Sequence, residues 1–231
     1  DPLLFLVSVD EVNDPPSFRV MPAHAAVRVR EDECTFSPCE RQGVLLDIAP
    51  GPADEAGQPL SFRVEVADDC RKLFAELPEF DAAGSLTFTT VLDAHGVATI
   101  RVVLHDGGTP REAASEGQNI TVVVSPINDA PSFEIPSRLE LLEDASPRTI
   151  LHGFARNIVA GPSDEDDQML SFAVSLAPGA PAALFSVPPQ LSSDGTLYFE
   201  LAPDASGTIS LDVILRDSGG RVGGGTDASF P

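Results

Sequence analysis

The sequence contains the same pattern twice, and this internal repeat constrains the fold more than any other feature. The segment Asn13–Phe18 (NDPPSF) returns as Asn128–Phe133 (NDAPSF), at an offset of 115 residues (128 − 13). Further matches follow in the same order: Gly51–Glu55 with Gly161–Glu165, Leu60–Phe62 with Leu170–Phe172, Gly84–Phe88 with Gly195–Phe199, and Leu104–Asp106 with Leu215–Asp217. The chain is therefore built from tandem units of about 110 residues each.

Each unit is predicted to consist of short β-strands. Apolar residues alternate with polar ones along Leu60–Val66, and again along its counterpart Leu170–Leu176, which is the period of a strand with one buried face. The other strands expected in the first unit are Ala25–Arg30, Val44–Ile48, Leu73–Ala75, Ser85–Thr89, Val97–Leu104 and Asn119–Val124. Turns rich in Gly, Pro, Asp and Asn separate them, and no amphipathic helix of useful length competes. We expect an all-β fold of tandem Greek-key, immunoglobulin-like β-sandwich repeats.

The repeat also predicts the domain boundaries. Residues 1–14 are expected to be the last strand and the linker of a preceding repeat, because Leu4–Val9 is similar to Asn119–Val124. Residues 15–129 form the first full repeat, and residues 130–231 form a second repeat that lacks its final strand. A sheet edge left open in this way can pair with another chain, so other copies or fibre proteins are candidate partners beside the neighbouring repeats.

The composition is strongly acidic. The chain has 14 Lys and Arg against 36 Asp and Glu, which gives a net charge of −22. Such a surface repels nucleic acid and anionic membranes and attracts cations, although acidity also serves solubility alone. No apolar run is long enough to cross a membrane, and no signal peptide is visible at the start of the chain. We therefore expect neither nucleic-acid binding nor membrane insertion of this segment.

The cysteines and a glycosylation motif are the sequence features that relate to whether the chain is secreted. Three cysteines occur, and Cys34 and Cys39 are close enough for a small local disulfide that would leave Cys70 over. The sequence alone does not settle which two of the three are paired. Asn119 opens an N-glycosylation motif, Asn-Ile-Thr, which has meaning only in a secreted chain.

Acidic residues fall at the ends of the predicted sandwich. In an immunoglobulin-like Greek key, Asp54, Asp106 and their counterparts lie in loops at the upper end of a repeat, near its N-terminus. Glu31 and Asp93 lie in loops at the lower end. At the junction of two repeats we therefore expect six residues to converge: Glu31, Asp93, Asn128, Asp129, Asp164 and Asp217.

Oxygen ligands gathered around a short linker suit Ca²⁺, which takes roughly six to eight of them. The earlier linker contributes Glu11, Asn13 and Asp14 to the same kind of site, together with Asp54 and Asp106. Bound ions would make the linkers rigid. The alternative needs no metal, because Asp-Gly and Asn-Asp-x-Pro are also strong turn signals and acidic loops are commonly just solvated.

The segment Val97–Phe133, with its Asp-Gly-Gly turn and its Asn-Asp linker, resembles the end of a cadherin repeat. Similar cadherin-like and immunoglobulin-like repeats occur in giant microbial adhesins and in algal surface or flagellar-hair fibres. The resemblance implies calcium ligands at Glu31, Asp54 or Asp164, Asp93, Asp106 or Asp217, and Asn128-Asp129. The chain departs from the cadherin pattern at His95, which stands in place of an acid, and at Pro126 and Ala130 in the linker, so fewer or weaker ions are implied.

Catalytic motifs are missing from the sequence. His24, His95, His105 and His152 have no repeat counterparts and no partner at meaningful spacing, and no nucleophile elbow or zinc motif occurs. We expect no enzymatic activity. The first functional hypothesis is a structural or adhesive stalk segment outside the cell, in a fibre, a cell-surface adhesin or a flagellar hair. The alternative is an extracellular module that binds a glycan or a receptor. A third possibility is a domain attached to an enzyme elsewhere in a longer chain.

Overall fold

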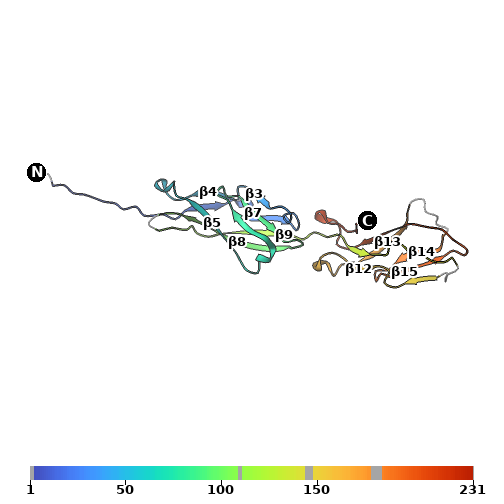
Figure 1. Ribbon diagram of the computed structural model, residues 1–231. Coiled ribbons are helices and arrows are strands. Elements are labelled where there is room, and N and C mark those ends of the chain that lie inside the picture. Colours follow the sequence, from blue (N-terminus) through green and yellow to red (C-terminus); the bar gives the residue numbers. More distant parts are fainter. Residues whose placement is uncertain (1–2, 109–110, 144–147, 178–183, 231) are drawn as a thin grey trace. The chain divides into compact units, whose positions relative to one another are not determined.

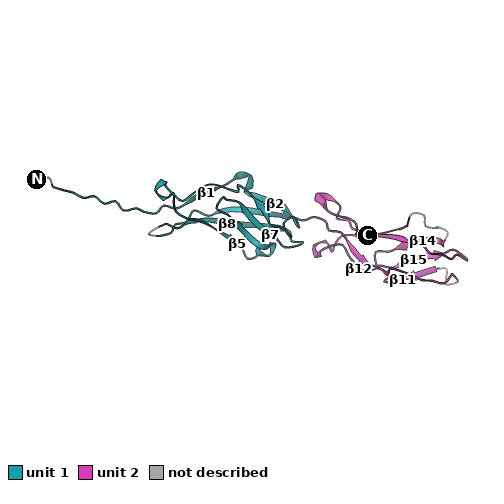
Figure 2. Ribbon diagram, turned by 45° about the horizontal axis from the view of Figure 1, so that its top comes forward, with its two compact units in different colours: residues 1–126 teal, residues 127–231 magenta. Residues whose placement is uncertain are grey.

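The structure is a computed structural model, and it describes residues 3–108, 111–143, 148–177 and 184–230. The chain forms two compact units, Asp1–Pro126 (unit 1) and Ile127–Pro231 (unit 2), which are coloured separately in Figure 2. Both units are all-β, as the alternating pattern predicts, and the only helical elements among the described residues are short 3-10 turns. No helix in this part of the chain has the length and hydropathy needed to cross a membrane.

Unit 1 contains two main sheets (Figure 1). One has four strands in the order β2-β9-β8-β5, the other has three in the order β3-β7-β6, and β1 pairs separately with β4. β2 runs parallel to β9, whereas every other pair is antiparallel. The bounds are Ser17–Val20 (β1), Ala26–Arg30 (β2), Cys39–Arg41 (β3), Leu45–Ala49 (β4), Leu60–Val66 (β5), Phe74–Phe80 (β6), Leu86–Thr90 (β7), Gly96–Asp106 (β8) and Gln118–Ser125 (β9).

The core of unit 1 is built from the inward residues of these strands. Alternate positions of three strands are almost completely buried: Leu86 and Phe88 on β7, Ile100, Val102 and Leu104 on β8, and Ile120, Val122 and Val124 on β9. Each of these large apolar side chains contributes about 1.5–3 kcal/mol by leaving water. Strand β9 therefore supplies a substantial part of the core, since it lies between β2 and β8.

Unit 2 repeats part of this arrangement. Its sheets are β11-β15-β14, β13-β16 and β10-β12, which correspond to β3-β7-β6, β5-β8 and β1-β4. The bounds are Ser132–Glu134 (β10), Arg148–Leu151 (β11), Arg156–Val159 (β12), Ser171–Leu176 (β13), Phe185–Leu191 (β14), Leu197–Leu201 (β15) and Leu211–Arg216 (β16). Among the described residues of unit 2, no strand corresponds to β2 or to β9. Counting described residues only, its core cluster has five buried residues, whereas that of unit 1 has nineteen.

Several predicted strands needed correction. The alternation of Leu60–Val66 gives β5 without change, but the predicted strand Leu73–Ala75 is in fact the start of the longer β6, Phe74–Phe80. Register shifts interrupt the pairing of β6 with β7, and these bulges break the alternation that would have revealed the strand. The short strands β1 and β3 were missed. Leu4–Val9 belongs to no strand, and residues 3–12 are exposed.

The disulfide joins Cys34 to Cys39, with their Cα atoms 5.1 Å apart, and Cys70 is the free thiol. The bond closes the loop between β2 and β3, and both of its cysteines are buried in the core of unit 1. It thus fastens the short strand β3 to the end of β2. The structure in this way selects one of the pairings that the sequence left open.

Candidate cation sites at the linker motifs

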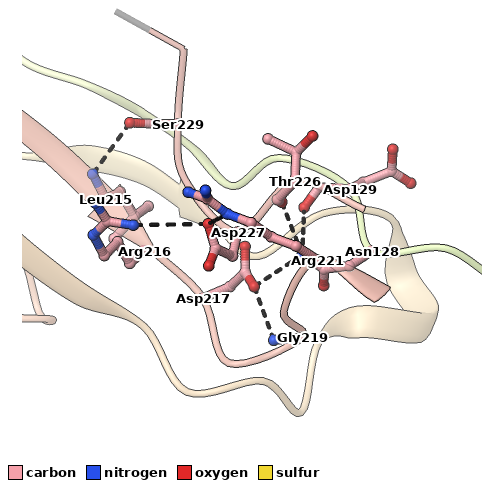
Figure 3. A network of polar contacts seen from close by, with 10 residues as sticks. All are labelled: Asn128, Asp129, Leu215, Arg216, Asp217, Gly219, Arg221, Thr226, Asp227 and Ser229. Atoms are coloured by element: carbon pink, nitrogen blue, oxygen red, sulfur yellow. Dashed lines mark hydrogen bonds and ion pairs between the residues drawn. The ribbon is translucent and has the colours of Figure 1, made fainter. Parts of the chain in front are cut away.

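The Asn-Asp motif of unit 2 is bonded into the upper end of that unit (Figure 3). The side-chain Nδ2 of Asn128 donates to Asp217 Oδ1 at 2.9 Å and to the backbone oxygen of Thr226 at 2.8 Å. Its Oδ1 accepts a hydrogen bond of 2.8 Å from Gln168 Nε2. One amide thus joins the linker to the loop after β16 and to the turn before β13.

A buried glutamate completes this arrangement. The backbone N–H of Asp129 donates to Glu165 Oε1 at 3.1 Å, and the Glu165 side chain is buried in the 3-10 turn η4, Ser163–Glu165. We call these contacts of Asn128, Asp129, Glu165, Gln168 and Asp217 the linker network of unit 2. They attach the linker to the unit that follows it.

Unit 1 holds its own linker in the same way. Asn13 Nδ2 donates to Asp106 Oδ1 at 3.1 Å, and Gln58 Nε2 donates to Asn13 Oδ1 at 2.7 Å. The backbone N–H of Asp14 donates to Glu55 Oε1 at 2.8 Å. Since Glu55 is only 2% exposed, its position in the turn η2, Ala53–Glu55, matches that of Glu165. The linker network of unit 1 therefore repeats three contacts of unit 2: Asn to Asp, Gln to Asn, and the backbone N–H of Asp to Glu.

Glycines make room for both networks. A Cβ at Gly51 would overlap with Glu55 Oε2, and a Cβ at Gly161 would overlap with Glu165 Oε2. A Cβ at Gly219 would overlap with Asn128 Oδ1. The recurring Gly-Pro and Asp-x-Gly sequences are thus explained by close packing against buried polar side chains.

Two buried carboxyl groups of the networks, Glu165 and Asp106, have pKa values shifted in opposite directions. Burial raises the pKa of Glu165 above its usual value; the N–H of Asp129 lowers this pKa, and the charges of Asp129, Asp164 and Asp217 raise it. Burial also acts to raise the pKa of Asp106, but hydrogen bonds from the backbone N–H groups of Ala113 and Gly108 outweigh it, so this pKa is lowered. The charges of Asp129, Asp164 and Asp217 thus act on the buried carboxyl group of Glu165 in unit 2.

Buried oxygen atoms without a hydrogen-bond partner occur in both networks. Among the described residues these include Oε2 of Glu165 and Oδ2 of Asp217 in unit 2, and Oε2 of Glu55 and Oε1 of Gln58 in unit 1. A buried carboxylate oxygen without a partner costs free energy, because it has lost its hydration. Carboxylate and amide oxygens are the ligands that Ca²⁺ takes, so the residues of unit 2 fit a hard cation.

The lower end of unit 1 holds a separate acidic group. Glu31 follows β2 and is 3% exposed, and its Oε2 lies 3.4 Å from Nδ1 of His95. The backbone N–H of Asp93 donates to Asp32 Oδ1 at 3.1 Å, and both aspartates have a positive φ. His95, where the cadherin pattern has an acid, is thus in contact with the predicted ligand Glu31.

The structure brings some of the predicted site residues together within a unit. Asn13, Asp14 and Asp106 belong to the network of unit 1, and Asn128, Asp129 and Asp217 belong to that of unit 2. Asp164 is exposed, as are its counterpart Asp54 and Glu11, although the charge of Asp164 acts on Glu165. The convergence of Glu31 and Asp93 with the acidic residues of unit 2 stays a prediction.

Four members of the networks were not predicted as site residues: Glu55, Gln58, Glu165 and Gln168. Their identity in both repeats was the available signal. Asn119, the predicted glycosylation site, lies on β9 with an exposed side chain.

Comparisons with known proteins give structural likeness only. No protein-family model and no curated protein matches the sequence. Solved structures similar to this chain include the human desmocollin-1 ectodomain (15% identity, TM-score 0.32), Drosophila N-cadherin EC1-4 (18%, 0.33) and human mucin-like protocadherin EC1-2 (15%, 0.39). All three are cadherin ectodomains. The matches cover 90%, 95% and 93% of this chain, and 35%, 50% and 94% of those chains.

The chain therefore spans half or less of the first two structures. The resemblance to cadherin repeats noted in the sequence has its counterpart among these structures. Likeness at such identities and TM-scores supports no argument about function, so the proposals below rest on the residues of this chain.

Proposed function

We propose that the chain is a structural or adhesive stalk segment of a large extracellular repeat protein or fibre. The observation that supports this most is the pair of matching linker networks, because each repeat binds the linker that enters it through the same Asn, Gln, Asp and Glu side chains. A linker that is attached in the same way at each repeat suits a chain of repeats joined end to end, as in a stalk. The Cys34–Cys39 disulfide supports an oxidising, extracellular compartment.

We further propose that Ca²⁺ binds at the upper end of unit 2. In the described part of unit 2, Oε2 of Glu165 and Oδ2 of Asp217 are buried oxygens that lack a hydrogen-bond partner, and the charges of Asp129 and Asp164 act on Glu165. A divalent cation there would offset both the desolvation of these oxygens and the repulsion among the four carboxylates. It would also strengthen the attachment of the linker.

Calorimetric titration with Ca²⁺ tests this site. We expect binding to the wild-type chain that weakens at least tenfold in Glu165→Gln, which removes one charge and keeps the shape of the side chain. Asp166→Asn is the matched control, because Asp166 is exposed in the same loop. If Glu165→Gln binds Ca²⁺ as tightly as the wild type, the proposed site is wrong, and the stalk proposal then stands on the linker networks alone.

A glycan array separates the stalk from the alternative, an extracellular module that binds a glycan or a receptor. A stalk segment is expected to bind none of the glycans, because the described part of the chain has few aromatic side chains on its surface to stack against sugar rings. Selective binding of one glycan class would favour the alternative.

The exposed Asn119 is the expected site of N-glycosylation if the chain is secreted by a eukaryotic cell. Peptide mapping of secreted material checks this prediction.

A further inference from the structure

The outer face of the four-stranded sheet of unit 1 is basic, although the chain as a whole is acidic. Alternate residues of β2, β9, β8 and β5 are buried in the core, so the residues between them point outward. Side chains charged at neutral pH occupy five outward strand positions, all exposed: Arg28 and Arg30 on β2, Arg63 and Glu65 on β5, and Arg101 on β8. Four positive charges against one negative charge give this surface, which we call the basic face, a net charge of +3.

The positive charges of the basic face outnumber their partners. Among the described residues, no ion pair involves Arg28 or Arg30. Glu65 serves two arginines at once, because its Oε2 lies 3.2 Å from Nη1 of Arg101 and its Oε1 lies 3.7 Å from Nε of Arg63. The face therefore keeps a surplus of guanidinium groups that are available to carboxylates of another molecule.

The outer face of the other sheet of unit 1, β3-β7-β6, is acidic. Glutamates lie at its outward positions, and all three are exposed: Glu40 on β3, and Glu76 and Glu79 on β6. None of them forms an ion pair with a described residue. The one other charged residue of these strands, Arg41, is ion-paired with Glu33 at 3.1 Å. We call the surface formed by the three glutamates the acidic face.

Comparison with unit 2 shows that the repeat does not need these charges to fold. Inward residues are kept between the repeats, as Phe62 and Phe172 show. The residues of unit 2 that correspond to the four arginines are neutral or acidic: Glu140, Leu142, Ala173 and Asp212. Those that correspond to Glu76 and Glu79 are Val187 and Gln190, in a strand with the same two register shifts. Both charged faces are thus particular to unit 1.

The two faces complement each other in charge and belong to opposite sheets of one unit. A guanidinium group can bind both oxygens of a carboxylate, so arginine on one sheet and glutamate on another form specific pairs when the sheets meet. The net charge of −22 does not prevent such a contact, because at physiological ionic strength a charge is screened beyond about 8 Å. A second copy of the chain therefore carries the acidic surface that the basic face fits.

We propose that the basic face of unit 1 in one molecule docks on the acidic face of unit 1 in a second copy. Each exposed ion pair contributes little affinity, but the complementary charges determine which faces meet. Because the two surfaces differ, the contact is heterologous and can be repeated from one copy to the next. The contact uses neither the linker networks nor a bound cation, so it can fail while the stalk proposal stands.

Asn119 gives this contact a steric test within the chain. It lies on the basic face, directly opposite Arg101 on the neighbouring strand. A glycan attached to Asn119 would cover the face and keep a second copy away. Docking of a copy and glycosylation of Asn119 therefore exclude each other, and the unglycosylated chain, produced in bacteria, is the form in which association is expected.

Sedimentation velocity of the unglycosylated 231-residue chain in chelator tests the contact. The average mass of the wild type should rise with concentration, and this rise should weaken between about 0.1 and 1 M salt, as the screening length falls from about 10 to 3 Å. The variants Arg28→Gln/Arg101→Gln and Glu76→Gln/Glu79→Gln should each associate at least tenfold more weakly. Mixed together they should form dimers of one copy of each, because each variant keeps the face that the other has lost.

Net charge separates this result from general repulsion between acidic chains. Glu76→Gln/Glu79→Gln reduces the net charge from −22 to −20, so its association would increase if net charge alone decided. Arg138→Gln/Arg156→Gln is the matched control, because it removes two exposed arginines from unit 2 and should associate like the wild type. All substituted side chains are exposed, so the melting temperatures of the variants should stay close to that of the wild type.

Chain secreted with a glycan on Asn119 provides a second readout. It should remain monomeric, and Asn119→Gln secreted from the same cells should associate again. A wild-type chain that is monomeric at every concentration would overturn the proposal. A mixture of the two double variants that stays monomeric would do so as well, and so would glycosylated chain that associates as strongly as the unglycosylated form.

Discussion

The side-chain amides of Asn13 and Asn128 form hydrogen bonds through both their Nδ2 and their Oδ1 atoms. Each Nδ2 donates to an aspartate of its own unit, and each Oδ1 accepts from a glutamine, so the amide is oriented by the contacts on both sides. An aspartate at either position would bring a second negative charge against Asp106 or Asp217. The linker motif therefore requires asparagine for a reason that does not depend on a metal.

The substitution Asn128→Ala measures what this amide contributes. It leaves Gln168 Nε2 and the oxygen of Thr226 without their partners, and buried polar groups without partners cost about 1–3 kcal/mol. We expect the free energy of unfolding of unit 2 to fall by about this amount in urea titrations, with unit 1 unchanged. Asn13→Ala is the reciprocal control and should destabilise unit 1 instead. Equal effects of either variant on both units would contradict separate networks.

Two glycines of one loop provide a second residue-level prediction. Gly51→Ala places a Cβ into Glu55 Oε2 and should destabilise unit 1 by about 1–3 kcal/mol through overpacking. At Gly57 nothing lies within 4 Å of an added Cβ, so Gly57→Ala should be neutral or slightly stabilising. Thermal unfolding of both variants checks this. If Gly51→Ala is as stable as Gly57→Ala, Glu55 does not occupy the position described.

Glu165 gives the stability of unit 2 a dependence on pH when no Ca²⁺ is present. Its pKa is raised in the folded state from an ordinary value of 4.5. The folded state therefore binds the proton more tightly than the unfolded state does. The stabilisation from protonating Glu165 is complete below pH 4.5 and is lost as pH rises through the raised pKa.

Urea unfolding in chelator should accordingly show unit 2 gaining stability as the pH falls from neutral towards 4.5. Glu165→Gln should remove this component. The lowered pKa of Asp106 has the opposite effect, because ionised Asp106 stabilises unit 1. This stabilisation is lost only when the pH falls below 3.8, the ordinary pKa of the group, and therefore not between neutral pH and 4.5. Identical pH dependences of wild type and Glu165→Gln would rule out this role of Glu165.

Sequence patterns identified the asparagines and aspartates of the networks but not the glutamates. Asp54 and Glu55 are adjacent carboxylates, and nothing in their order says which one is buried. The 3-10 turn that follows Pro52 directs Glu55 inward and leaves Asp54 exposed. Which side chain enters the network is thus decided by the local backbone, which residue types alone do not reveal.

At the scale of elements, the disulfide fixes the short strand β3. In the chain-entropy description, closing the loop from Cys34 to Cys39 is worth about 2 kcal/mol. Reduction with dithiothreitol should therefore lower the melting temperature of unit 1 and leave that of unit 2 unchanged. Cys70→Ser, which removes the thiol outside the disulfide, is the control and should leave the response to reductant intact. A shift in unit 2 alone would contradict the assignment.

Strand prediction succeeded where alternation is uninterrupted and failed where the pairing is irregular. β5 and β8 pair in register over seven residues, and the alternation of β5 is correspondingly clear in the sequence. β6 contains Pro78 and two register shifts, so its period is lost. β1 and β3 have only four and three residues, too few to show a period. The β-sandwich class was therefore predictable, while the edges of its sheets were not.

At the scale of the whole molecule, the two repeats share part of their strand pairing and differ in the size of their cores. Among the described residues, the core cluster of unit 1 contains nineteen buried residues and that of unit 2 contains five, so we expect unit 2 of this chain to unfold at the lower temperature. The net charge of −22 adds repulsion throughout, and bound cations would reduce it. Stabilisation by Ca²⁺ should thus be most visible in the transition of unit 2.

Differential scanning calorimetry in Ca²⁺, in Mg²⁺ and in chelator tests the proposed cation-stabilised stalk most directly. At about 100 times its dissociation constant, Ca²⁺ should stabilise unit 2 by about 2.7 kcal/mol and raise the lower transition by several degrees. This rise should persist in Asp166→Asn, vanish in Glu165→Gln and be absent in Mg²⁺ alone. Transitions that coincide in Ca²⁺ and in chelator would contradict a cation-stabilised stalk, and would leave repeats whose linkers are held by hydrogen bonds only.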